Sequence, residues 1–328
     1  MQNAPTVISL EDLGTLRTHG PDAIQFLQGQ LSNDLAKLSP ERSLLAGYHN
    51  PQGRTIALLR LLWLGANDVL AVLPRELVPT VAARLSRFVL RAKVKIQDVS
   101  TEWRVYGHIG AEPPAGSDRV ITRVSLSEPR WLVASREAPG EAADGASAAL
   151  DAAARVQHDR KAWRRLDIAA GLPQVVAATS EEFVAQMLNL DALDAIAFDK
   201  GCYTGQEVIA RAHYRGRVKR RLQRFVTRGA VPVGGGAIGD GAAPATSAAL
   251  APGDSGQLAD GRTFKVVDAT MLDDGRCEFL AVTPVVSSEA PAAPAAPLPP
   301  SAAANDDSAT SAVAVDAEQL PLPYALKD

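Results

Sequence analysis

Residues 198–221 read FDKGCYTGQEVIARAHYRGRVKRR and place a cysteine, a helix start and a run of basic side chains next to one another. Thr204 and Glu207 have the spacing of a capping box, in which the threonine side chain accepts from one free amide of a helix and the glutamate reaches back to another. This spacing predicts a helix that begins at Gly205 and runs to about Tyr214. The stretch is therefore a loop followed by a helix, and the chemistry of the loop depends on its cysteine.

Cys202 precedes the predicted helix start by two residues of loop. The positive end of the helix dipole and the neighbouring Lys200 would both favour the thiolate over the thiol, so a reactive thiolate is one interpretation. The alternative is a small buried apolar residue, which is the commoner role of an isolated cysteine. Glu207 has a similar alternative as a simple capping residue.

Eight Lys or Arg side chains and no acid lie between Arg211 and Arg228. Such a run is usually a solvated face of a strand, but beside the cysteine loop it could also form a pocket rim that binds carboxylates or phosphates. A nucleic-acid-binding module is a weaker alternative, because only Tyr214 and Phe225 lie among the cations for stacking on bases.

The whole chain has 328 residues and a formal charge of −3, which excludes a protein that binds polyanions through its bulk charge. Its length allows two or three domains. Cys202 and Cys277 are far apart and no C-x-x-C is present, so neither a disulfide framework nor a complete metal or iron–sulfur site is expected. We expect a cytoplasmic protein without a membrane partner, because no signal peptide is apparent and the longest apolar run, residues 56–64, contains Arg60.

The apolar pattern of the first 225 residues mixes strands and helices and indicates an α+β fold. The expected strands are residues 7–10, 15–19, 56–64, 69–73, 94–99 and 103–109. Four helices are expected: one that opens at Gly20, one near residues 77–88, one near residues 141–157 and one that contains Trp163. The helix that opens at Gly20 would have Leu31 and Leu35 on its buried face. The helix of Trp163 would end at Gly171.

The composition changes after residue 225. Short alternating segments rich in Gly, Pro, Val and Thr favour a small β-barrel or sandwich. Residues 290–304 are almost entirely Ala and Pro and are expected to form a linker. The final LPLPYALKD is apolar again, and we expect it to dock on the β domain as an edge segment, with a disordered tail as the alternative.

The octapeptide KGCYTGQE, residues 200–207, resembles the signature of the YgfZ folate-binding family. This family is related to the glycine-cleavage aminomethyltransferase and to a mitochondrial iron–sulfur assembly factor. The resemblance covers about residues 1–285 and the LPLPYAL tail. Further segments match in the family's order: residues 20–23, 26–30, 33–34, 52–54, 171–173, Gln186 with 189–190, 210–216 and 219–220.

The resemblance implies an α+β ring of three domains of the glycine-cleavage T-protein type. Residues 1–45 and 160–225 would form a discontinuous folate-binding domain that contains KGCYTGQE, residues 46–159 an inserted ferredoxin-like domain, and residues 226–286 a small β-barrel. Residues 287–315 would be the linker, and residues 316–328 would dock on the barrel.

The resemblance also implies tetrahydrofolate as the cofactor, held in the central opening with Cys202 at its mouth. Trp163 lies where bacterial members of the family place a folate-stacking tryptophan, whereas Leu13 replaces their second aromatic. A folate pocket needs an apolar or aromatic wall, polar groups for the pterin edge and cations for the glutamate tail. The other residues expected to contact the cofactor are Asn33, Asp34, Arg54, Gln186, Tyr203, Gln206, Arg211 and Arg217.

Two functions follow from the resemblance. The first is a folate-dependent accessory protein for iron–sulfur cluster assembly or repair, with folate, client iron–sulfur proteins and, weakly, tRNA as partners. Cys202 would act as a thiolate, while Lys200 and Glu207 would orient its loop. The second is a tetrahydrofolate-dependent aminomethyltransferase, for which Asp34 is the only obvious catalytic carboxylate. Transferase relatives usually lack this cysteine and the Gln206-Glu207 pair, so the accessory function is favoured over a classical enzyme.

Overall fold

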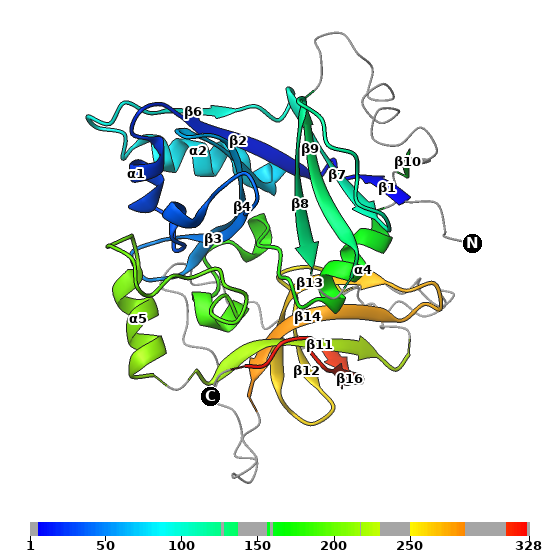
Figure 1. Ribbon diagram of the computed structural model, residues 1–328. Helices are drawn as coiled ribbons and strands as arrows, with labels where there is room; N and C mark the ends of the chain where they lie inside the picture. The colour runs from blue at the N-terminus through cyan, green and yellow to red at the C-terminus, as the bar shows by residue number, and fades with distance from the viewer. Residues whose placement is uncertain are drawn as a thin grey trace, which may run out of the picture.

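The computed structural model describes residues 6–125, 128–136, 156–157, 160–216, 218–229, 250–285 and 313–326. Within these residues the strands form three sheets, and short helices lie between and beside them (Figure 1). This mixture confirms the α+β organisation expected from the sequence. No helix in the described ranges combines the length and apolar character needed to cross a bilayer.

The first sheet has the order β3-β4-β5-β2-β6, and all its neighbours are antiparallel. Its strands are β2 (Leu13–His19), β3 (Leu44–His49), β4 (Thr55–Gly65), β5 (Asp68–Pro74) and β6 (Lys95–Asp98). Helices α1 (Ala23–Gln28) and α2 (Val78–Ser86) belong to the same part of the chain. The alternation of buried positions along α2, at Val78, Val81 and Leu85, turns one side of that helix toward the core.

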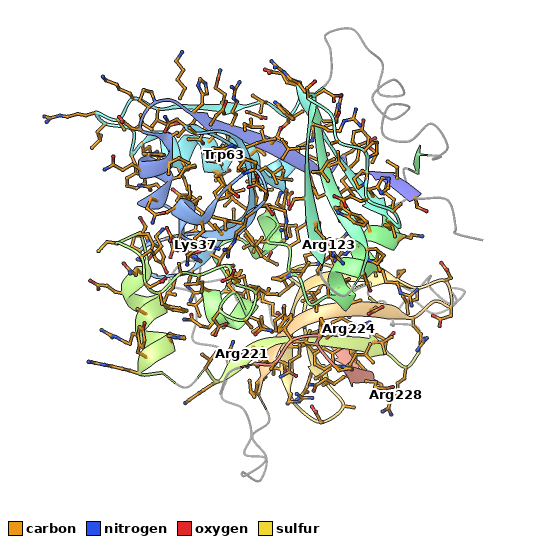
Figure 2. All side chains as sticks on the ribbon, in the orientation of Figure 1. Lys37, Trp63, Arg123, Arg221, Arg224 and Arg228 are labelled. Atoms are coloured by element: carbon orange, nitrogen blue, oxygen red, sulfur yellow. The ribbon has the colours of Figure 1, made fainter. Side chains whose placement is uncertain are left out.

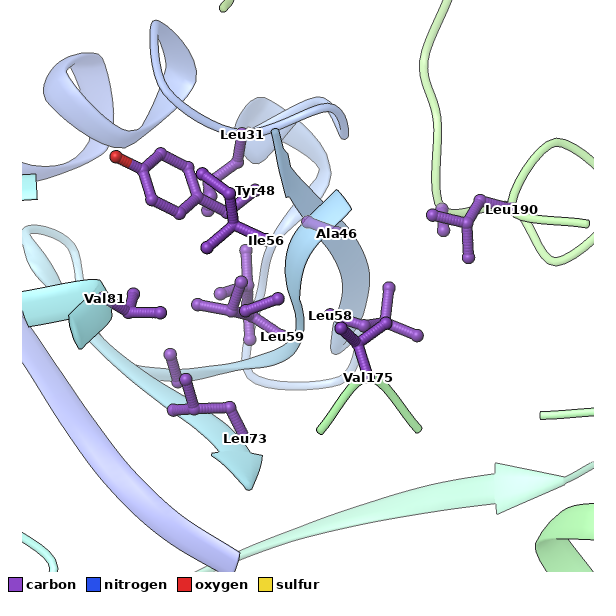
Figure 3. Packing of buried hydrophobic residues seen from close by; sticks show 14 of the residues in the cluster. Leu31, Ala46, Tyr48, Ile56, Leu58, Leu59, Leu73, Val81, Val175 and Leu190 are labelled. Atoms are coloured by element: carbon purple, nitrogen blue, oxygen red, sulfur yellow. The ribbon is translucent and has the colours of Figure 1, made fainter. Parts of the chain in front are cut away.

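The largest core joins this sheet to a later part of the chain. Figure 3 shows Tyr48, Ile56 and Leu59 of the sheet in the same cluster as Val175 and Leu190. Because these later residues pack among the strands, the segments around residues 175 and 190 are held in place by the first sheet.

The second sheet has the order β10-β1-β7-β9-β8. Its strands are β1 (Thr6–Ser9), β7 (Trp103–Ile109), β8 (Arg119–Ser125), β9 (Arg130–Arg136) and β10 (Val156–Gln157). Only the β1–β10 pair is parallel. Helix α4 (Lys161–Ala169) follows this sheet and packs Trp163 against Gly107 of β7. As expected, α4 stops just before Gly171, which has a φ of 64°.

The third sheet is barrel-like, with the order β15-β12-β13-β14-β11-β16. Its strands are β11 (Arg220–Thr227), β12 (Ser255–Leu258), β13 (Thr263–Met271), β14 (Cys277–Pro284), β15 (Val313–Val315) and β16 (Ala317–Leu320). Only Asp316 separates β15 from β16, and these two strands pair with β12 and β11 at the two ends of the sheet. The C-terminal segment therefore brings both edges together.

Several expected boundaries differ from the observed elements. The domain boundary expected at residues 45 and 46 falls inside β3, and β2 shares its sheet with strands from beyond that boundary. The end of the expected linker, residues 313–315, is strand β15. The Ala-rich helix expected near 141–157 lies outside the described residues, except that its last two positions are strand β10.

Helix α1 is shorter than the sequence pattern predicted. It ends at Gln28, Leu31 pairs with Tyr48 in an isolated bridge, and Leu35 begins a separate 3-10 turn, η1 (Leu35–Lys37). The amide of Leu35 donates to the Gln28 side chain at 2.7 Å, and the amide of Asp34 donates to the Asn33 side chain at 2.8 Å. Such side-chain contacts to the backbone compete with helix hydrogen bonds, which explains why the apolar spacing was misleading.

Candidate functional site

The loop that carries Cys202 ends where α5 (Gln206–Tyr214) begins, within one residue of the predicted start. The predicted capping box does not form, because no side chain caps this helix and its N-cap is Gly205 in a left-handed conformation, with φ of 81°. A Cβ at Gly205 would stand 2.5 Å from the carbonyl oxygen of Asn50. Glycine thus lets the loop pass close to the turn at Asn50. The predicted start of α5 was correct to one residue, but the capping box from which it was predicted was wrong.

The two cysteines have opposite environments. Cys202 is exposed, whereas Cys277 is buried in β14, where burial raises the pKa of its thiol to about 11. The alternative interpretation of Cys202 as a buried apolar residue is therefore wrong. No three His, Cys, Asp or Glu side chains in the described segments are placed to hold a metal ion.

Lys200 anchors the cysteine loop to the chain that follows α1. Its Nζ donates to the carbonyl oxygens of Gln28, Leu31 and Asn33 at 2.7, 2.7 and 2.8 Å, and lies 5.1 Å from the centre of the Tyr203 ring. Burial lowers the pKa of Lys200 to about 8. Three backbone acceptors around one amine leave the side chain little freedom, so Lys200 holds its loop in place.

Asn33 and Asp34 also have structural partners. The Asn33 amide donates to two backbone carbonyls at 2.7 and 2.8 Å. The Asp34 carboxylate accepts from the Gln28 side chain at 2.9 Å and from the Ala36 amide at 3.2 Å, which makes it the N-cap of η1. Burial acts against ionisation of Asp34, but these hydrogen bonds outweigh it and lower the pKa.

Three further residues expected to contact the cofactor lie in the packing around the loop. The Gln186 side chain is buried and donates to the carbonyl oxygen of Ile209 in α5 at 2.6 Å. Arg54 donates to the carbonyl oxygen of Glu182 at 2.6 Å. Tyr203 is buried, and this raises the pKa of its hydroxyl to about 12. Of these side chains, Gln186 supports α5 directly, whereas Arg54 holds the segment at Glu182.

A cavity of about 370 Å³ lies beside Trp163 and Leu13, the two residues expected to hold the pterin. It forms where α4 and β13 meet the turn between β1 and β2, and its wall includes Leu10 and Gln174. A smaller cavity of about 90 Å³ shares Leu13, Trp163 and Gln174 with it. We call the larger space the Trp163 cavity.

The Trp163 ring is mostly packed, with 5% of the residue exposed. A Cβ on Gly107 would stand 2.3 Å from the ring, so only glycine leaves room for the indole on β7. The guanidinium carbon of Arg130 is 5.0 Å from the ring centre, and its Nη1 donates to Asp167 at 2.6 Å. The ring is thus held rigidly at the cavity wall.

Ion pairs line the Trp163 cavity. The Arg164 Nε lies 2.5 Å from an Asp268 carboxylate oxygen, and Arg160 pairs with Asp12. Burial raises the pKa of Asp268 to about 6, although Arg164 acts in the opposite direction. Burial likewise raises the pKa of Asp167, against the effect of the Arg130 guanidinium. The cavity therefore presents both carboxylates and cations next to an aromatic wall.

The structure divides the expected site residues into two groups. Of the expected site residues that the structure describes, Trp163 and Leu13 are the two that line the Trp163 cavity. Figure 1 shows α5 and the loop before it at the left of the molecule and α4 at the right. Cys202 is not in the lining of the Trp163 cavity, so this cavity does not have the thiol that was expected at the mouth of the cofactor site. The residues outside the cavity lining are Cys202, Lys200, Glu207, Asn33, Asp34, Arg54, Gln186, Tyr203, Gln206 and Arg211, and Arg217 is not among the described residues.

Sequence reasoning missed the cations of the cavity, which are Arg160, Lys161 and Arg164. A signal was present, because these residues surround Trp163 in the segment DRKAWRR of residues 159–165. Asp268 had no such local signal, since it lies 104 residues from its partner Arg164.

The basic run that begins in α5 also separates into two sets. Arg221 and Arg224 lie on β11, and Arg228 comes directly after it; all three are labelled in Figure 2. They pair with Asp191, Glu278 and Asp316 respectively. These three cations form ion pairs within the protein. By contrast, the part of the chain that the structure describes contains no ion-pair partner for the exposed cations Arg211, Arg215 and Lys219.

The fold is that of the glycine-cleavage aminomethyltransferases. A solved structure of aminomethyltransferase T of the glycine cleavage system from Bartonella henselae matches 85% of this chain and 78% of its own, with a TM-score of 0.60 and 12% sequence identity. At this identity the similarity establishes the fold alone, and it confirms the T-protein type of architecture expected from the sequence.

Sequence comparison places the chain more narrowly within this fold class. The "tRNA-modifying protein YgfZ" of Sodalis glossinidius is 31% identical over 289 residues, which cover 82% of each chain. The protein of the same name from Serratia proteamaculans is 33% identical over 236 residues, or 66% of this chain and 69% of the relative. No family model matches the chain. The chain belongs to the YgfZ family.

Proposed function

We propose that this protein binds tetrahydrofolate and supports the assembly or repair of iron–sulfur clusters in client enzymes, including enzymes that modify tRNA. The relatives named as tRNA-modifying proteins support the last part. The observation that carries the folate part is the Trp163 cavity, because it brings an aromatic wall, buried carboxylates and cations together.

The cavity suits a reduced pterin with a glutamate tail. Its volume of about 370 Å³ falls in the range of small-molecule sites, which begins at about 300 Å³. Trp163 and Leu13 supply apolar contacts, and the buried Asp268 carboxylate can accept hydrogen bonds from N–H groups of the pterin. Lys161 is exposed at the start of α4, and Arg160, which also pairs with Asp12, directly precedes it. Both can pair with the carboxylates of the tail.

The thiol would act at a separate position. Cys202 is exposed on a loop that Gly205 and Lys200 hold in place, so a client protein can reach it without entering the Trp163 cavity. We infer that the Cys202 sulfur serves as a transient ligand for the iron of a client cluster: it gives its proton to water and replaces a water ligand of that iron, and the exchange reverses on release. A reducing compartment such as the cytoplasm would keep the exposed thiol available for this role.

The aminomethyltransferase alternative lacks comparable support. Its candidate carboxylate, Asp34, caps η1 and is not part of the lining of the Trp163 cavity. The folate and this carboxylate would therefore occupy different places in the molecule.

The folate part is tested with two ligands. Tetrahydrofolate and tetrahydropteroate, which lacks the glutamate tail, are titrated calorimetrically against the wild type and an Arg160→Gln/Lys161→Gln variant. The wild type should prefer tetrahydrofolate, and the variant should lose most of this preference, because partly exposed charge pairs contribute about 0.2–1 kcal/mol each. Two such pairs correspond to a change of about 2- to 30-fold.

An Arg87→Gln/Arg91→Gln variant is the matched control, since these cations are exposed and are not part of the cavity lining. It should bind both ligands as the wild type does. Absence of tetrahydrofolate binding, or an equal loss in the control, would refute the assignment of the cavity. Separately, Cys202→Ala should lower iron–sulfur enzyme activity in cells without changing tetrahydrofolate affinity.

A further inference from the structure

The exposed cations at the end of α5 have no role in the proposed folate site. Arg211 and Arg215 are one helical turn apart, and Lys219 follows before β11 begins. None of the three lines the Trp163 cavity, and none has an ion-pair partner within the described residues. The nearest acid before them along the chain, Glu207, lies a turn earlier on the helix. This end of α5 is therefore locally basic on a chain with a net charge of −3.

An exposed aromatic ring lies among these cations. Tyr214 is 67% exposed, although it belongs to a cluster of three rings. His213 stacks on Phe198 with ring centres 3.7 Å apart, and Tyr214 meets both rings edge-on, at 4.8 Å from His213 and 6.1 Å from Phe198. The rings of His213 and Phe198 fix the direction of Tyr214 and leave much of the residue in solvent.

We propose that Arg211, Tyr214, Arg215 and Lys219 form a contact site for single-stranded RNA. A base would stack on the exposed tyrosine ring, and the neighbouring phosphates would pair with the cations. Because the ring is already held by Phe198 and His213, stacking would cost little additional side-chain entropy. This inference goes beyond the proposed function, because it assigns RNA to this chain and requires neither folate nor an iron–sulfur protein.

The aromatic ring favours RNA over an acidic protein as the partner. The C-terminal end of a helix attracts cations through its dipole, which accounts for Arg211 but not for the exposure of Tyr214. An acidic peptide would pair with the cations and gain little from one exposed tyrosine. Every base, by contrast, has a face that can stack on it.

The test is fluorescence anisotropy with a labelled, unstructured RNA of about 12 nucleotides, a length within the range that such sites cover. Tyr214→Ala should weaken binding about tenfold, while Tyr214→Phe should bind as the wild type does. Each lost phosphate contact makes the slope of log affinity against log salt shallower by about 0.7 for a single strand, so Arg211→Gln/Arg215→Gln should reduce the slope by about 1.4.

The controls separate the alternatives. Arg87→Gln/Arg91→Gln removes the same charge from another exposed segment and should leave RNA affinity unchanged. A labelled polyglutamate peptide of equal charge should bind weakly and should not respond to Tyr214→Ala. No RNA binding at low salt, an equal effect of the control variant, or polyglutamate binding as tight as RNA binding would overturn the proposal.

Discussion

Replacing Gly205 by alanine should disrupt the cysteine loop, and the structure gives the size of the effect. A residue with a Cβ pays about 1–2 kcal/mol in the left-handed conformation that Gly205 adopts at φ of 81°. The new Cβ would also stand 2.5 Å from the Asn50 carbonyl oxygen, so the backbone must shift. Together these effects should destabilise the loop and the start of α5 by about 2–4 kcal/mol.

Gly201→Ala is the matched control in the same loop. Apart from its own chain neighbours, no heavy atom lies within 4 Å of a Cβ at Gly201, so this change should remain within about 0.5 kcal/mol of the wild type. Two measurements report on the loop: amide hydrogen exchange at Ile209, whose N–H donates to the Gly205 carbonyl at 3.3 Å, and the rate at which Cys202 reacts with Ellman's reagent. Equal exchange and equal thiol reactivity in the two variants would refute the reasoning.

Three further changes test other contacts. Burial lowers the pKa of His49 from 6.5 to about 3. Between these pH values His49 is protonated in the unfolded chain and neutral in the folded chain. The free energy of unfolding should therefore fall by up to about 4–5 kcal/mol as the pH falls from 6.5 to 3. Urea titrations of His49→Gln should show a flatter acid dependence, and an unchanged dependence would contradict this assignment. Arg164→Gln removes the partner of Asp268, whose side chain is only 2% exposed, and leaves its charge buried. Because the Arg164 side chain is 39% exposed, the cost should be less than for a fully buried pair, and the free energy of unfolding from urea titration should fall by about 2–3 kcal/mol. Adding Asp268→Asn should restore most of that loss, and a double variant as unstable as the single one would argue against the pair. Tyr324→Phe removes a hydrogen bond of 2.8 Å to the Gly171 carbonyl and should cost about 1 kcal/mol, with faster proteolysis of the C-terminal segment as the readout; unchanged proteolysis would mean that this bond does not hold the tail.

Local patterns in the sequence predicted where α4 and α5 lie, whereas the apolar spacing after Gly20 predicted a longer helix than α1. The bounds of α5 were correct to one residue, and the end of α4 at Gly171 followed from its glycine. The capping box does not form because the N-cap of α5 is Gly205, in a left-handed conformation, and not Thr204. The sequence around Thr204 is compatible with either a capping box or a left-handed glycine at the helix start. The close approach of the Asn50 carbonyl to Gly205, which favours the glycine, is not visible in the local sequence.

Long-range contacts could not be predicted from the sequence. Lys200 looked like a neighbour of the thiol, but its amine reaches carbonyl groups about 170 positions earlier in the chain, including that of Gln28. The basic run looked continuous, yet Arg221 and Arg224 are neutralised by Asp191 and Glu278 from other segments. Such pairings depend on how the sheets assemble, for which a single sequence carries no local signal.

In the proposed function, tetrahydrofolate binds in the Trp163 cavity and the thiol of Cys202 lies outside it. Thr270 lines the Trp163 cavity on the same face of β13 as Asp268, so Thr270→Phe would place a ring in the space proposed for the pterin. Equilibrium dialysis should show that Thr270→Phe loses tetrahydrofolate binding and that Cys202→Ser binds it as the wild type does. Retained binding in Thr270→Phe together with lost binding in Cys202→Ser would place the folate at the cysteine loop and contradict the account.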